Sequence, residues 1–243
     1  MRQPPLSATI LTFCGMAVLI GLGLWQIDRL HWKEALLAAI EQAYNTPPAM
    51  LDDTAFMAAP DDEIFLRRGQ IRGQFMTSAA FHIIPRTYQG QYGSHLIVPF
   101  RLSAPYRGGI VLVNAGWVPG APGHDDSPVT DKTALPDGIV TLTGLLRMAD
   151  RPHFFTPENE PARDRWYVID HDRITARFDL DRTPADPVFY VEKPVSGAPY
   201  PVPHEGTWRP NNNHLSYAIF WLSMAFVLAV IFFLRFVMER KNL

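Results

Sequence analysis

Three residues near the C-terminus, His214, Tyr217 and Trp221, have the types and the spacing to hold a flat aromatic ligand. Residues three, four and seven apart share one face of a helix, so a helix here carries an imidazole and two aromatic rings on one side. Aromatic faces can lie against a flat ligand while the imidazole reaches its centre. The commoner explanation of such residues is an aromatic belt at a membrane boundary, in which His214 is an ordinary interfacial polar residue.

The segment around these residues predicts where they lie. Three asparagines, Asn211 to Asn213, precede His214 and are good helix N-caps because a short side-chain oxygen accepts from the first free N–H groups. Residues 214–237 are almost all apolar, about the length that crosses a hydrocarbon core of roughly 30 Å. The sequence therefore predicts a second transmembrane helix over 214–237, with His214 at the membrane surface.

A first apolar segment, residues 6–27, contains no charge and predicts a transmembrane helix. A cleaved signal peptide is the alternative, although the segment is long for one and no small-x-small cleavage site follows directly. No helix breaker follows, so we expect the helix to continue to about residue 44. Gly15, Gly21 and Gly23 would let another helix approach closely.

Arg29 lies between Trp25 and Trp32 just beyond this segment. A guanidinium both stacks on aromatic rings and bonds bidentately to anions, so Arg29 is suited to an anionic lipid head group or to a ligand carboxylate. If the two helices pack together, these residues lie at the same depth as His214.

Residues 45–213 predict one β-rich domain, and the fold class is an α+β membrane protein with an antiparallel sheet or small barrel between two transmembrane helices. Only one short helix is expected, near 173–178. The single cysteine, Cys14, lies in the first apolar segment, which excludes a disulfide within the domain. The predicted strands are LRRGQIRGQF, AAFHIIPRTY, SHLIVPFRLS, GIVLVNAGWV, GIVTLTGLLR, RWYVID and VFYVEK.

No constellation typical of an enzyme is present. The sequence lacks G-x-S-x-G, H-E-x-x-H, C-x-x-C and a phosphate-binding glycine loop. Ser94 and His95 do not form a catalytic pair, because neighbours on a strand point to opposite faces. With 22 basic and 24 acidic residues and a net charge of -2, the chain gives no sign of a nucleic-acid partner.

Five segments follow one another along nearly the whole chain: WQIDRLHWK, VLVNAGWVP, TLTGLLR, the Arg151 to Asp170 segment and NNHLSYAIFW. Together, and in this order, they resemble the Surfeit locus protein 1 family. The resemblance implies a non-enzymatic assembly factor for cytochrome c oxidase in the bacterial cytoplasmic or mitochondrial inner membrane, with the domain in the periplasm or intermembrane space. The arginine-rich composition favours a bacterium, and Arg2 with the C-terminal basic residues favours both termini being cytoplasmic. Implied partners are the main, haem-bearing oxidase subunit, membrane lipid and the haem a synthesis machinery. The family usually has an arginine directly before the glycine and tryptophan of the strand segment VLVNAGWVP. This chain has Ala115 at that position, before Gly116 and Trp117.

The resemblance also implies haem a as the bound cofactor, with His214 as axial ligand of its iron, the usual task of a neutral imidazole. Residues expected to complete the site are Tyr217 and Trp221 or Trp25 against the haem face, and Arg29 or Arg209 near the propionates. The alternative function is a membrane scaffold that stabilises an oxidase subunit during assembly and binds no haem. An enzyme, such as a membrane-anchored hydrolase, remains a third class.

Overall fold

The computed structural model describes residues 5–56, 65–103, 108–122, 133–204 and 211–236. The chain forms two compact units, one of residues 1–38 with 209–243 and one of residues 39–208.

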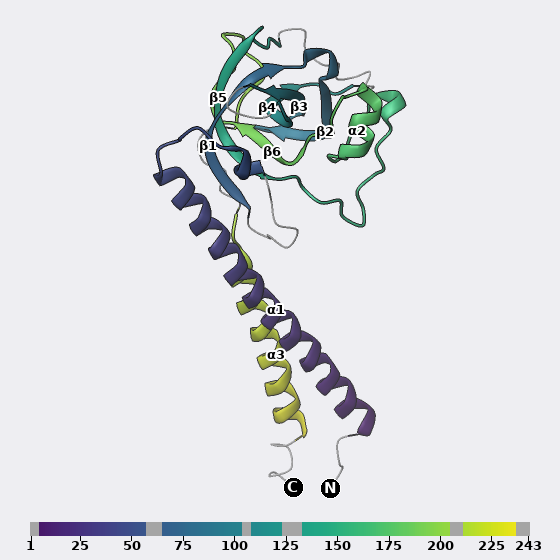
Figure 1. Cartoon of the computed structure of the whole chain (residues 1–243). Helices are drawn as coiled ribbons and strands as arrows, with labels where there is room; N and C mark the ends of the chain where they lie inside the picture. Colours follow the sequence, from purple (N-terminus) through teal and green to yellow (C-terminus); the bar gives the residue numbers. More distant parts are fainter. Residues whose placement is uncertain (1–4, 57–64, 104–107, 123–132, 205–210, 237–243) are drawn as a thin grey trace. The chain divides into compact units, whose positions relative to one another are not determined.

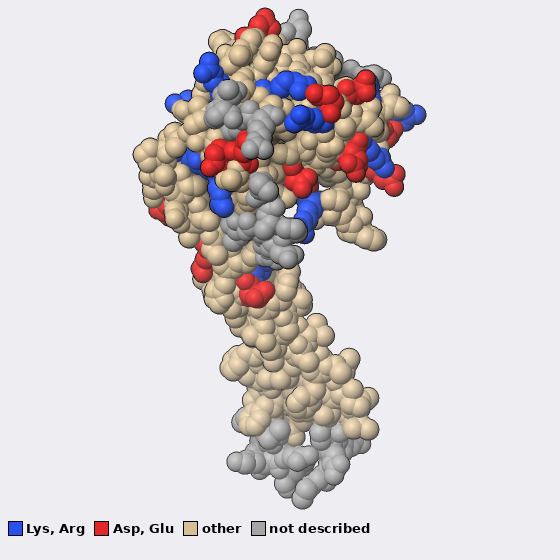
Figure 2. Space-filling model, in the orientation of Figure 1, with Lys and Arg blue, Asp and Glu red and all other residues tan. Residues whose placement is uncertain are grey.

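The first unit is a pair of helices. Helix α1 spans Leu6–Asn45 and α3 spans His214–Phe236, and both are long and apolar enough to cross a membrane. Figure 1 shows them running side by side, and Figure 2 shows no charged side chain over much of the visible face of the pair. Two helices of this kind at the two ends of the chain confirm the predicted helical part of the fold.

Small residues set how closely the two helices approach. A Cβ atom added at Gly23 would lie 2.7 Å from a methyl carbon of Leu222, and one at Gly15 would lie 3.3 Å from Leu228. Ala218 of α3 is likewise buried. Gly21, which the sequence also suggested, has nothing within 4 Å of the same position. Two of the three glycines therefore lie on the helix contact.

The second unit is built on six strands. They are β1 (Leu66–Phe75), β2 (Phe81–Tyr88), β3 (Gln91–Leu102), β4 (Ile110–Pro119), β5 (Ile139–Met148) and β6 (Ala185–Val191). Their order is β1-β5-β6-β4-β3-β2, and β1 also pairs with β3, which closes the sheet into a barrel-like ring. The strands confirm the predicted β-rich fold class.

One pairing differs from the antiparallel expectation. Strand β6 pairs parallel with β4 and antiparallel with β5, whereas the other pairings are antiparallel. The connection from β5 to β6 includes α2 (His171–Phe178), long enough for the chain to return and insert β6 between β5 and β4. Asp170 caps α2, its side chain accepting from the Arg173 N–H.

The predicted strand RWYVID is wrong, because residues 165–170 form only isolated bridges. The side chain of Asn159 accepts from the N–H groups of Tyr167 and Val168 and donates to the Val168 carbonyl. These backbone groups are therefore satisfied without a partner strand. Trp166 is fully buried, with its ring 5.1 Å from that of Phe81. The apolar pattern of this segment comes from that anchor and not from a ladder.

Candidate functional site

The predicted site is organised around the first residue of α3. The backbone carbonyl of Asn213 accepts from the Tyr217 N–H, so His214 lies in the first helical turn. Its ring Nδ1 lies 2.7 Å from Oε1 of Gln26, a buried residue of α1. This hydrogen bond places residue 26 of one helix level with residue 214 of the other.

The partner atom determines the protonation of the imidazole. An amide oxygen only accepts hydrogen bonds, so Nδ1 of His214 carries the proton and donates it to Gln26. In the neutral ring, Nε2 then holds the lone pair. A histidine oriented through one nitrogen with the other left basic is the usual arrangement for a metal ligand. The chemistry of His214 therefore fits an axial ligand of haem iron.

The other predicted residues lie within two helical turns of this pair or outside the described segments. Trp25 and Tyr217 are more than half exposed, at 55% and 54%, and Trp221 is half-buried. The guanidinium of Arg29 lies 3.9 Å from the ring centre of Trp32. Arg209 falls outside the described residues.

These positions fit both explanations of the aromatic residues. Exposed rings of Trp25 and Tyr217 suit contact with lipid as well as with a flat ligand. Arg29, stacked on Trp32, places a charged group about one turn along α1 from Gln26, where it suits an anionic lipid head group as well as a ligand carboxylate. The assignment of these residues to a haem site stays a prediction, and the partner that sequence reasoning missed is Gln26.

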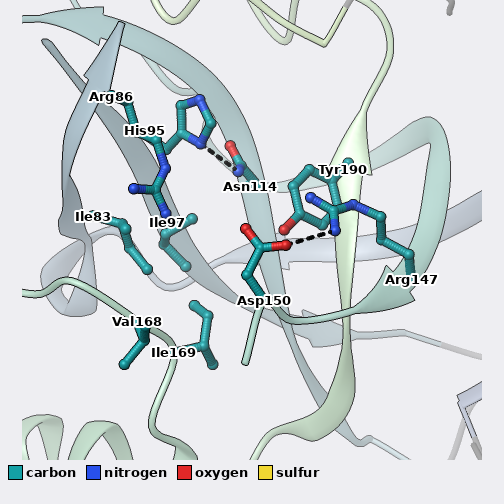
Figure 3. Close-up of a pocket in the computed structure, with 10 residues that line it drawn as sticks. All are labelled: Ile83, Arg86, His95, Ile97, Asn114, Arg147, Asp150, Val168, Ile169 and Tyr190. Atoms are coloured by element: carbon teal, nitrogen blue, oxygen red, sulfur yellow. Dashed lines mark hydrogen bonds and ion pairs between the residues drawn. The ribbon is translucent and has the colours of Figure 1, made fainter. Parts of the chain in front are cut away.

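A second cluster of polar side chains lies within the β domain and was not predicted. A cavity of about 210 Å³ is lined by Tyr44, His95, Leu145, Arg147, Asp150, Tyr190, Glu192 and His204. A smaller pocket adjoins it and shares His95, Arg147, Asp150 and Tyr190 (Figure 3). The side chains of the larger cavity come from the end of α1, from β3, β5 and β6, and from the segments that follow β5 and β6.

Burial and neighbouring charge keep both histidines of this cavity neutral. Burial is the largest cause of a pKa lowered to about 2 for His95 and to about 4 for His204. Repulsion by Arg86 and Arg147 lowers both values further, and Asp150 opposes this for His204. The positive field of two guanidinium groups therefore reaches both rings.

Ser94 and His95 have separate surroundings, as strand alternation predicts. Ser94 Oγ lies 3.0 Å from His82 Nδ1 and donates to the Gly120 carbonyl, whereas His95 Nδ1 lies 3.2 Å from the Asn114 side-chain amide. Alternation was a usable signal that His95 points away from Ser94, but nothing in the sequence paired it with His204. Among the described residues, no group of three His, Cys, Asp or Glu side chains is placed to hold a metal ion.

Comparison with known proteins adds evidence from the whole chain. The model of the SURF1 family matches residues 13–226. The chain is 29% identical to Surfeit locus protein 1 of Mus musculus over 241 residues, which is 91% of this chain and 73% of that protein. The human Surfeit locus protein 1 is 28% identical over 239 residues, with 89% and 73% covered. A SURF1-like protein of Monosiga brevicollis is 31% identical over 242 residues, covering 95% of this chain and 85% of the relative.

Proposed function

This chain belongs to the SURF1 family, and we propose that it is an assembly factor for cytochrome c oxidase that binds haem a and assists its insertion into the main oxidase subunit. The observation that carries the haem proposal is the hydrogen bond between His214 and Gln26. It fixes the ring and leaves Nε2 basic, as an axial ligand requires. The proposed role requires the protein to bind and release haem, and it requires no covalent reaction catalysed by the protein.

The residues around His214 have separate tasks in this proposal. His214 holds the iron, and Gln26 keeps the imidazole in the ligating tautomer. Trp25 and Tyr217 offer aromatic faces to the macrocycle, together with Trp221. The propionates are assigned to Arg29, which already stacks on a tryptophan, and to Arg209. Haem held by one iron ligand, two propionate pairings and otherwise ring faces can be released to a partner without breaking many polar bonds.

We place the protein in the bacterial cytoplasmic membrane, with α1 and α3 as its two crossings. Arg2 and the basic residues at the C-terminal end favour the cytoplasm for both termini, and the β domain is then periplasmic. Alkaline phosphatase fused to the C-terminus should stay inactive and a fluorescent protein at the same site should glow. The opposite pair of results would reverse the orientation.

The test of haem binding is the optical spectrum of the full chain, purified in detergent from cells that make haem a. We expect a haem signal in the parent and its loss in His214→Ala. The matched control is His31→Ala, because His31 is an exposed histidine of α1. Unchanged haem content in His214→Ala would remove the ligand assignment, and a colourless parent that still captures the oxidase would establish the scaffold function instead.

One observation favours the scaffold as a second candidate function. Phe154 and Phe155 follow β5 in a turn and are 95% and 89% exposed. Adjacent exposed aromatic rings of this size are typical of contact surfaces. Under the scaffold function, changing both to serine should reduce co-purification of the main oxidase subunit and leave haem content unchanged. Full retention of the subunit would exclude this turn as the contact.

A further inference from the structure

The cavity of the β domain contains polar groups that the proposed haem function does not use. Its volume is about 210 Å³, whereas one water molecule occupies about 30 Å³ in the liquid. The cavity therefore has room for a small organic molecule. It lies wholly within the unit of residues 39–208. An inference about it is therefore independent of the helix site.

One polar atom in the cavity wall is buried and has no partner. Nε2 of His204 makes no hydrogen bond to the part of the chain that the structure describes, although buried polar atoms are normally satisfied. The ring of His204 is held by edge contacts, with centroids 4.8 Å from His95 and 5.1 Å from Tyr190. A fixed imidazole with an unsatisfied nitrogen in a cavity wall needs a partner that the described residues do not supply.

A second polar group is oriented by the protein backbone. Oδ1 of Asn114 accepts from the Gly116 N–H, which directs the amide nitrogen toward Nδ1 of His95. Because that nitrogen donates, Nδ1 of the neutral His95 ring is the acceptor and the proton is on Nε2. His95 therefore offers an N–H donor rather than a lone pair.

The charges around the cavity favour an anion. The guanidinium of Arg147 stacks 3.9 Å from the ring centre of Tyr190 and bonds to Asp150 at 3.1 Å, and the Asp150 side chain is 60% exposed. Figure 3 shows Arg86 and Arg147 on either side of the Asp150 carboxylate. The other acid in the lining, Glu192, accepts three hydrogen bonds from Arg68. One exposed carboxylate thus faces two guanidinium groups.

The rest of the wall is apolar. Leu145 and the rings of Tyr44 and Tyr190 line the larger cavity, and Ile83 and Ile97 line the adjoining pocket. A bare inorganic ion would leave these surfaces without a partner. The lining therefore matches a negatively charged group attached to a short apolar or aromatic body.

We propose that this cavity binds a small organic anion, whose carboxylate pairs with Arg147 and hydrogen-bonds to His204 while its apolar body lies against Tyr190 and Leu145. An anion there also offsets the field of Arg86 and Arg147 on the two imidazoles. Binding therefore raises the pKa of His204 from its value of about 4, and proton uptake accompanies binding. Asp150, the acid facing His204, also raises this pKa, so the anion is bound more tightly near pH 5 than at pH 8.

The test is isothermal titration calorimetry of the full chain in detergent micelles, with benzoate as the probe and empty micelles as the blank. Benzamide is the neutral comparison of the same shape, and inorganic phosphate is the comparison without an apolar body. We expect heat from benzoate, none from benzamide and a weaker response to phosphate. Equal binding of benzamide, or no binding of benzoate by the folded protein, would overturn the proposal. Phosphate that binds as well as benzoate would overturn the requirement for an organic body.

Two variants locate the probe. Arg147→Met removes the charge, and we expect affinity for benzoate to fall about tenfold to a hundredfold, as for loss of a charge-assisted hydrogen bond. His204→Phe keeps the ring contacts and removes Nε2, so the affinity should fall and its pH dependence should disappear. Arg163→Met changes a guanidinium that is 71% exposed elsewhere on the domain and is the matched control. Circular dichroism establishes that each variant is folded, and unchanged benzoate affinity in both cavity variants would contradict the assignment.

Discussion

Replacing Gln26 by leucine should weaken haem binding without abolishing it. Leucine is close to glutamine in size but cannot accept from Nδ1 of His214, so the ring loses the bond that fixes its tautomer. Loss of such a hydrogen bond typically lowers metal affinity tenfold to a hundredfold, which is about 1.4 to 2.8 kcal/mol. The bond is short, 2.7 Å, and Gln26 is only 9% exposed, so little water is available to replace it. We therefore expect a loss of at least about tenfold, against complete loss in His214→Ala.

Two measurements separate this effect from simple damage to the helix pair. Haem titration followed by absorption gives the affinity, and ¹⁵N chemical shifts of the imidazole in the haem-free protein report which nitrogen carries the proton. Gln26→Glu keeps a hydrogen-bond acceptor at this position. Its haem affinity and its imidazole ¹⁵N shifts should therefore be closer to those of the parent than the values of Gln26→Leu are. Gln42→Leu, an exposed glutamine of the same helix, is the control and should change neither. The reasoning is refuted if Gln26→Leu leaves the affinity and the ring shifts unchanged.

Three further predictions concern the β domain and are measured by urea unfolding of the full chain in detergent. Gly116→Ala should lower the free energy of unfolding by about 3 kcal/mol or more, because φ is 134° and the new Cβ would clash with the Val202 carbonyl oxygen. Gly138→Ala, with open space around the new Cβ, should lower it by about 1 kcal/mol. Arg68→Met should lower the free energy of unfolding by about 3 to 5 kcal/mol, because the carboxylate of Glu192, which is 5% exposed, loses its partner. Changing both residues to methionine should recover much of that loss. Stability should fall as pH drops from about 6.5 toward 4, because the unfolded chain takes up a proton that the folded His204 refuses until its lowered pKa is reached. His204→Phe should therefore lose about 1 kcal/mol less than the parent between pH 7.5 and 5.5, and an equal loss would contradict the assignment.

Features set by local pattern could be predicted from the sequence. Two uninterrupted apolar segments indicated both long helices, and alternation with β-branched residues indicated the six strands. The segment 165–170 shows where the pattern misleads. Trp166 is a buried anchor, and the neighbouring N–H groups are satisfied by the distant side chain of Asn159. Such a contact between a loop and a side chain leaves no periodic trace in the sequence.

Sites that depend on long-range pairing were only half predictable. His214 could be selected because its spacing to Tyr217 and Trp221 is a property of one helix. Gln26 could not, because its role arises only when residue 23 lets α3 approach and brings position 26 level with position 214. On its own, a glutamine near the end of an apolar segment indicates no more than the edge of the membrane.

The cavity of the β domain depends entirely on such long-range pairing, so no part of it could be predicted from local spacing. His95 and His204 are separated by more than a hundred residues and meet only because β6 inserts between β4 and β5 and the chain then turns back past the sheet. The parallel pairing of β4 with β6 is the step that the sequence did not reveal, and the neighbouring Tyr190 and Asn114 depend on it directly, since they are register partners. A variant that disturbs this pairing should therefore abolish anion binding. The same variant should raise the pKa values of both histidines back toward the ordinary value for histidine. Disturbing the contact of Gly23 with Leu222 should instead affect haem binding through Gln26 and leave the cavity unchanged.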